Sequence, residues 1–110
     1  MSTPHSRIGD CWLFEPIGTI DHDSPLAEEI GRLLDEGRPR IVLDLSSVQM
    51  ITSAGLGLLV QLTARANSQG ARFVLTSPSP FVQGVLQITR LIRFFEIHPS
   101  RADAMSAVNA

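Results

Sequence analysis

The segment Ser46–Gly57, which reads SSVQMITSAGLG, contains the residue types most able to do chemistry in this sequence. It joins an apolar run to a predicted helix, and Ser53 stands where that helix begins. The first N–H groups of a helix lack partners within the helix and carry the positive end of its dipole. A phosphate on Ser53 would therefore meet favourable donors. Gly55 and Gly57 add little bulk, so a partner's backbone or a nucleotide could approach closely.

A purely structural interpretation of the same residues is also open. Serine is among the commonest helix N-caps, and glycines near a strand-to-helix turn often serve packing alone. Capping explains the residue type of Ser53 as well as phosphorylation does. The local pattern therefore does not choose between a structural cap and a modification site.

Motifs for catalysis and metal binding are incomplete. A nucleophile elbow needs glycine two positions before the serine, where this chain has Ile51. A phosphate-binding P-loop needs a lysine, and the chain contains none. The cluster Asp21-His22-Asp23 has ligand-type residues, but adjacent residues rarely face one site, so we interpret it as a solvated turn. We expect no enzymatic activity, no metal and no cofactor.

Composition narrows the classes of partner and the location. The 110 residues include 9 basic and 11 acidic ones, for a net charge of -2, which argues against a nucleic-acid partner. Cys11 is the single cysteine, which suits a reducing cytosol. The first ten residues lack the apolar core of a signal peptide, and the apolar stretch Ile51–Val60 is too short to span a bilayer. We expect a cytoplasmic protein without direct membrane insertion.

Apolar runs and turn residues alternate along the chain. Residues 1–9 are predicted to be a flexible tail, and residues 10–110 a single domain. Helices are predicted to begin after the cap residues Ser24, Ser79 and Ser100, and a longer one covers residues 53–69. Strands are predicted at 11–14, 19–20, 41–45, 72–75 and 94–97, with a loop at 46–52. This alternation predicts an α/β fold with a mostly mixed or parallel sheet.

The longer helix has more apolar surface than one buried stripe needs. Its predicted inner stripe consists of Leu56, Leu59, Val60 and Thr63. Leu58 and Leu62 are offset from that stripe. The helix either contacts two neighbours, which we favour, or presents a partly exposed binding patch.

The stretch from Ile41 to Met105, which begins IVLDLSSVQMITSAGLGLLV, resembles a STAS domain, the family of sulfate-transporter cytoplasmic domains and anti-sigma-factor antagonists. The upstream GTIDHDSPLAEEIGRLL is similar to the family's glycine-x-x-aspartate lead-in to its first helix. The resemblance covers nearly the whole chain after the tail. It implies an α/β fold of STAS type, with a mixed central sheet of about four or five strands and about four helices mainly on one face.

The resemblance also implies a function. In such systems the unphosphorylated antagonist binds an anti-sigma factor that is a serine kinase, and so frees the sigma factor. The kinase uses ATP to phosphorylate the antagonist's serine, the complex separates, and a serine phosphatase resets the cycle. The phosphoacceptor falls on Ser53 and the lead-in aspartate on Asp21, which is expected near the acceptor. Gly55, Leu56 and Gly57 match the glycine-leucine-glycine that opens the partner-facing helix.

Two positions depart from the best-studied antagonists. Thr52 replaces an aspartate, which removes a negative charge beside the acceptor, and Ala54 replaces a serine or threonine, which removes a competing hydroxyl.

An alternative within the family is a constitutive, unphosphorylated STAS subunit of a membrane-associated complex such as a phospholipid-transport ATPase. The partner surface is predicted to contain Asp21, His22, Thr52, Ser53, Ala54, Gly55, Leu58 and Leu62.

Overall fold

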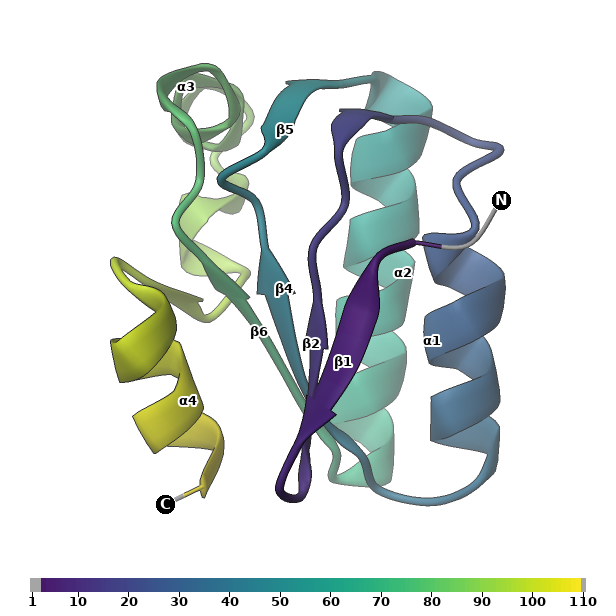
Figure 1. Cartoon of the computed structure of the whole chain (residues 1–110). Helices are drawn as coiled ribbons and strands as arrows, with labels where there is room; N and C mark the ends of the chain where they lie inside the picture. Colours follow the sequence, from purple (N-terminus) through teal and green to yellow (C-terminus); the bar gives the residue numbers. More distant parts are fainter. Residues whose placement is uncertain (1–2, 110) are drawn as a thin grey trace.

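The computed structural model in Figure 1 describes residues 3–109. Its strands are β1 (His5–Ile8), β2 (Cys11–Phe14), β3 (Gly18–Ile20), β4 (Arg40–Asp44), β5 (Val48–Ile51), β6 (Arg72–Thr76) and β7 (Ile97–His98). Its helices are α1 (Leu26–Asp35), α2 (Ser53–Gln69), α3 (Pro80–Ile88) and α4 (Arg101–Asn109), with one turn of 3-10 helix, η1, at Leu91–Arg93.

Five strands form the main sheet, in the order β1-β2-β4-β6-β7. The edge strand β1 is antiparallel to β2, and every other neighbouring pair is parallel. Strands β3 and β5 form a separate parallel pair beyond the carboxyl ends of β2 and β4, next to the start of α2. The structure therefore confirms the predicted α/β fold with a mixed sheet.

Helices cover both faces of the sheet, unequally. Figure 1 shows α1 and α2 on one face and α4 on the other, while α3 packs against β5. On β4, Ile41 and Leu43 belong to the larger core under α1 and α2, and Val42 belongs to the smaller core under α4. All three side chains are fully buried, which explains why this strand has no polar alternation in the sequence.

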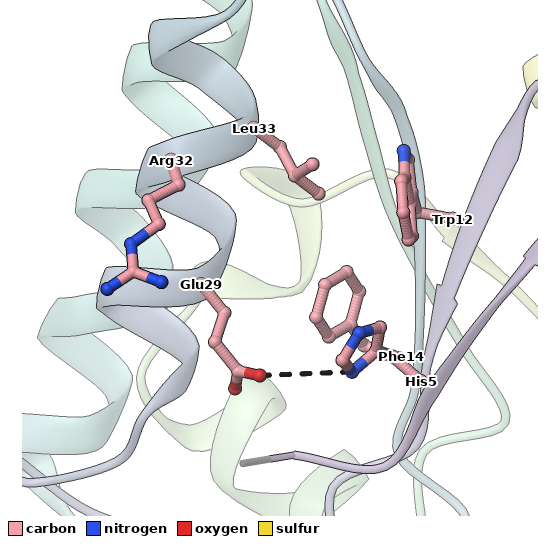
Figure 2. A pocket seen from close by; sticks show the side chains of 6 residues that line it. All are labelled: His5, Trp12, Phe14, Glu29, Arg32 and Leu33. Carbon is pink, nitrogen blue, oxygen red and sulfur yellow. Dashed lines mark ion pairs between the residues drawn. The ribbon is translucent and has the colours of Figure 1, made fainter.

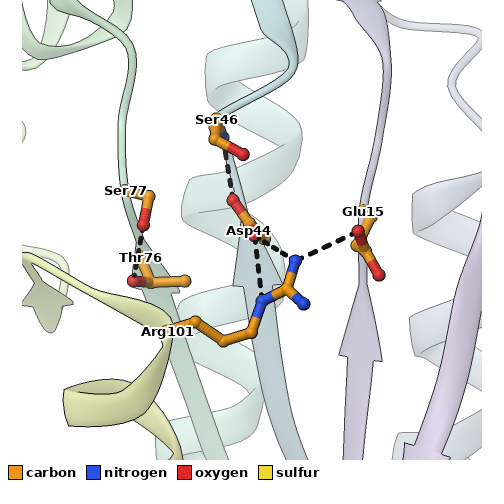
Figure 3. Close-up of polar contacts among 6 residues, drawn as sticks. All are labelled: Glu15, Asp44, Ser46, Thr76, Ser77 and Arg101. Atoms are coloured by element: carbon orange, nitrogen blue, oxygen red, sulfur yellow. Dashed lines mark hydrogen bonds and ion pairs between the residues drawn. The ribbon is translucent and has the colours of Figure 1, made fainter.

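An ionic cluster at the carboxyl end of β4 holds α4 to the sheet (Figure 3). Asp44 is only 5% exposed and accepts hydrogen bonds from Arg101 Nη2 at 2.7 Å and from the Ser46 N–H at 2.9 Å. Arg101 also contacts Glu15 Oε2 at 3.1 Å. Burial by itself would raise the pKa of Asp44, but the hydrogen bonds from Arg101 and Ser46 outweigh it and lower the pKa. The first residue of α4 is thus anchored to an ionised carboxylate.

The predicted flexible tail at residues 1–9 is wrong for His5–Ile8, which form β1. Residues 1 and 2 lie outside the described residues. Beside the small pocket in Figure 2, the His5 ring stacks on Phe14 with 5.0 Å between ring centroids and faces Glu29. Glu29 also accepts a hydrogen bond from the Thr3 N–H at 3.0 Å. These contacts come from α1 and β2, so the polar composition of the segment could not reveal them.

Two other predicted elements differ from the structure. The segment 46–52, predicted as a loop, contains β5, which shows a weak sequence signal because only its two end residues are buried. Of the strand predicted at 94–97, only Ile97 lies in a strand, the two-residue β7, and residues 94–96 form a turn after η1. Phe95 turns into the larger core and its N–H bonds back to the Leu91 carbonyl at 3.3 Å, so the chain cannot be extended there.

Each of the three predicted cap serines accepts a backbone N–H at the start of its helix. Ser79 Oγ accepts from the Val82 N–H at 3.4 Å, and Ser100 Oγ accepts from the Asp103 N–H at 3.1 Å. At α1 the residue before the first helical position is Pro25, and Ser24 Oγ, one residue earlier, accepts from the Leu26 N–H at 3.4 Å. None of the helices in residues 3–109 has the length and apolar character needed to cross a membrane.

Candidate functional site

The start of α2 lies at the carboxyl end of the β3–β5 pair, and Thr52 rather than Ser53 caps it. Thr52 has an extended backbone, with φ of −83° and ψ of 167°, and its Oγ1 accepts the Gly55 N–H at 3.1 Å. The structural interpretation of Ser53 as the helix cap, which the sequence left open, is therefore wrong. Ser53 is the first helical residue, and both it and Ala54 are exposed.

Asp21 reaches this helix start from the end of β3, as predicted. The Thr52 hydroxyl donates to Asp21 Oδ1 at 2.7 Å, and the Thr52 N–H donates to the Ile20 carbonyl at 3.1 Å. Hydrogen bonding from Thr52, followed by that from His22, lowers the pKa of Asp21. The carboxylate is thus ionised at neutral pH, and it binds the hydroxyl beside the predicted acceptor rather than the acceptor itself.

His22 and Asp23 complete the small polar cluster around Asp21. The His22 N–H donates to Asp21 Oδ1 at 2.7 Å, and the possible ligand atoms of the three side chains lie within 4.8 Å of one another. His22 and Asp23 are exposed, and Asp21 already accepts hydrogen bonds from Thr52 and His22. This geometry fits the predicted solvated turn.

Gly55 is needed for the contact between β3 and α2, not for a partner. A Cβ at this position would lie 2.1 Å from the carbonyl oxygen of Ile20 and 2.6 Å from its carbonyl carbon. Gly55 is also buried, which contradicts its predicted place on the partner surface. Gly57, by contrast, is exposed, and a Cβ there would have no neighbour within 4 Å.

The structure confirms the favoured interpretation of α2 as a helix with two neighbours, and it contradicts the predicted place of Leu62 on the partner surface. Leu62 is only 6% exposed and belongs to the larger core, because α2 packs against both α1 and β6. Leu58 is partly buried and packs against the same core.

Sequence reasoning missed Met50 on β5, which is 50% exposed two residues before Thr52. Recognising β5 as a strand with an outward-facing position would have identified it.

The two neighbouring hydroxyls differ in what they can still do. The Thr52 hydroxyl is both a donor to Asp21 and an acceptor from Gly55. The Ser53 side chain makes no hydrogen bond within residues 3–109, and the Ser53 and Ala54 N–H groups have no partner there either. Ser53 is therefore an accessible hydroxyl next to two free amide donors at the positive end of a 17-residue helix.

Replacing Thr52 with alanine is expected to reduce the free energy of unfolding by about 1–2 kcal/mol, because the cap and the Asp21 hydrogen bond are both lost. Urea denaturation followed by circular dichroism measures the change. Thr52→Ser is the matched control and should stay within about 0.5 kcal/mol of the parent, since the hydroxyl is retained. Equal losses in both variants would mean that the threonine methyl group, not its hydroxyl, matters here.

Comparison with known proteins places this site in a family. The family model described as the STAS domain matches residues 6–104. A Thermotoga maritima protein named as a candidate anti-sigma factor antagonist is 37% identical over 75 residues, which span 68% of this chain and just under two thirds (66%) of the relative. BtrV of Bordetella bronchiseptica, named in the same way, is 30% identical over 82 residues, 74% of this chain and 71% of the relative.

Solved structures agree with the family match. The crystal structure of a Thermotoga maritima protein, also titled as a candidate anti-sigma factor antagonist, superposes with a TM-score of 0.83 at 28% identity. The superposition covers 98% of this chain and 95% of that chain. The likeness thus extends over the sheet, the helices and the start of α2.

Proposed function

This chain belongs to the STAS domain family, and from that premise we propose that it acts as an anti-sigma factor antagonist in a partner switch. In its unphosphorylated form it binds an anti-sigma factor that is also a serine kinase. Phosphorylation of Ser53 releases it, and a serine phosphatase restores the binding form. The protein is a binding module and a kinase substrate rather than an enzyme, needs no cofactor, and works in the cytoplasm.

The accessibility of Ser53 at the start of α2 is the observation that carries this proposal. Its hydroxyl is exposed and makes no hydrogen bond within the described residues, so a kinase can reach it without unfolding the domain. The free Ser53 and Ala54 amides and the helix dipole favour the phosphate once it is attached. The γ-phosphoryl group of ATP would pass to Ser53 Oγ, ADP would leave, and the hydroxyl proton would go to a base on the kinase.

The neighbouring acidic residues explain why the added phosphate would end binding. Asp21 is ionised beside Thr52, and Asp23 lies in the same cluster. A phosphoserine adds a charge of about −1.5 to −2 to this already negative surface. A partner that packs over the neutral Ser53 hydroxyl would then have to bury an unpaired anion next to like charges.

Thr52 replaces the aspartate of the best-studied antagonists, and Asp21 supports the proposal by supplying a carboxylate close by. Its Oδ1 lies 2.7 Å from Thr52 Oγ1, one residue from the acceptor. The hydrogen bond from Thr52 fixes this carboxylate at the helix start. One carboxylate, that of the lead-in aspartate on β3, therefore lies beside Thr52, while the charge of an aspartate at position 52 itself is missing.

Incubation with the cognate anti-sigma kinase and ATP tests the proposal. Intact-mass spectrometry should show one added phosphoryl group on the parent protein and none on Ser53→Ala. Ser47→Ala is the matched control, because Ser47 is also exposed, and it should be modified like the parent. Phosphate on Thr52, Ser46 or Ser47, or a stable complex that ATP never modifies, would contradict the proposal, and the latter would favour a constitutive STAS subunit.

A further inference from the structure

Helix α3 has an outward apolar stripe that the proposed switch does not use. The helix reads PFVQGVLQI and contains no charged residue. Its buried side is formed by Val82 and Leu86, each 0% exposed. On its other side Phe81 is 50% exposed and Ile88 is 84% exposed, with the half-buried Val85 between them. Positions 81, 85 and 88 have the spacing that places side chains along one helix face.

Two arginines without acidic partners lie at the end of this stripe. Arg90 and Arg93 make no ion pair within residues 3–109, which is also true of Arg7, Arg38 and Arg40, whereas the other four arginines each pair with a carboxylate. Together with Gln87 and Ile92, Arg90 and Arg93 line a hollow of about 280 Å³. The end of α3 is thus a local basic site on a chain whose net charge is -2.

We infer that the outer face of α3 and the Arg90–Arg93 hollow form a docking surface for an acidic amphipathic helix of a partner protein. The apolar anchors of that helix would cover Phe81 and Ile88, and a carboxylate beside them would enter the hollow between the arginines. Charge complementarity selects this occupant, because carboxylates would neutralise Arg90 and Arg93, which line the same hollow and have no ion pair within the described residues. This docking surface lies apart from Ser53, because Figure 1 shows α3 and α2 on opposite sides of β5.

Other occupants fit the surface less well. In a symmetric dimer through α3, the arginines of each copy would face a helix that has no acidic residue, so they would stay unpaired. Two arginines attract an anionic lipid surface only weakly on a chain of net charge -2, and a flat bilayer would leave the hollow unfilled. An acidic amphipathic helix of a protein would cover the apolar stripe and would place a carboxylate in the hollow.

Two synthetic helical peptides test the inference. Both carry leucine at the same i, i+4 and i+7 positions, but one has glutamate and the other lysine at the remaining positions. Titration calorimetry should detect binding of the glutamate peptide only. Ile88→Gln should weaken it about tenfold or more, because the anchor is lost. Ile17→Gln is the control, since Ile17 is 70% exposed but lies between β2 and β3, and it should bind like the parent.

Charge reversal gives the sharper readout. The double variant Arg90→Glu/Arg93→Glu should lose the glutamate peptide and gain the lysine peptide. Ser53→Asp should leave peptide binding unchanged, which separates this surface from the proposed switch. Equal binding of both peptides by the parent, no binding of either, or loss of binding in Ser53→Asp would overturn the inference. Self-association or binding to phosphatidylglycerol vesicles that Ile88→Gln abolishes would overturn it in favour of a second copy or a membrane.

Discussion

Replacing Gly55 with alanine is expected to lower the free energy of unfolding by about 3 kcal/mol or more. The new Cβ would lie 2.1 Å from the Ile20 carbonyl oxygen, far inside van der Waals contact. The obstacle is backbone, so a change of rotamer cannot relieve it. The Ile20 carbonyl also accepts the Thr52 N–H at 3.1 Å, so moving it would disturb the start of α2.

Gly57→Ala is the matched control two residues further along the same helix. A Cβ there meets nothing within 4 Å, and the residue is exposed. Alanine should therefore raise the free energy of unfolding by up to about 1 kcal/mol through its higher helix propensity. Urea denaturation of both variants gives the comparison. A similar effect at both positions would show that helix propensity, rather than the approach of β3, governs Gly55.

The elements that form the core could be predicted because their sequence signals are local. The apolar run of β4 reflects burial on both faces, and Ser79 at the start of α3 forms its cap within three residues of chain. The position of Ser53 at the start of α2 was predicted for the same reason. The predicted end of α2 at residue 69 also holds, since Gly70 follows it with a φ of 73°, which favours glycine.

The errors at the site come from contacts between residues far apart in the sequence. Thr52 and Ser53 are both good N-caps, and what distinguishes them is Asp21, 31 residues earlier, which bonds to Thr52. The sequence predicts that a partner could approach Gly55 closely, because nothing nearby in the sequence shows that the Ile20 carbonyl fills the space beside it. Leu62 looked offset because the position of α1 beside α2 is set by the tertiary fold.

A negative charge at Ser53 is expected to weaken binding to the anti-sigma kinase by about a hundredfold or more. In the proposed complex the partner packs over the exposed Ser53 and Ala54, beside the ionised Asp21. Ser53→Asp would place a second carboxylate there, and an unpaired buried charge at an interface costs several kcal/mol. About 2.7 kcal/mol already corresponds to a hundredfold change in the dissociation constant. Titration calorimetry without ATP measures the affinity.

Ser68→Asp is the control for charge alone. Ser68 is exposed on the same helix, and its Cα lies roughly 22 Å along the axis from Ser53, since a helix rises about 1.5 Å per residue. The added carboxylate faces the unfavourable end of the helix dipole, so circular dichroism should first establish that the variant is folded. Its affinity for the kinase should stay close to that of the parent, as should that of Ser53→Ala. If both aspartate variants weaken binding equally, net charge rather than the Ser53 position controls the complex, and the proposed switch fails.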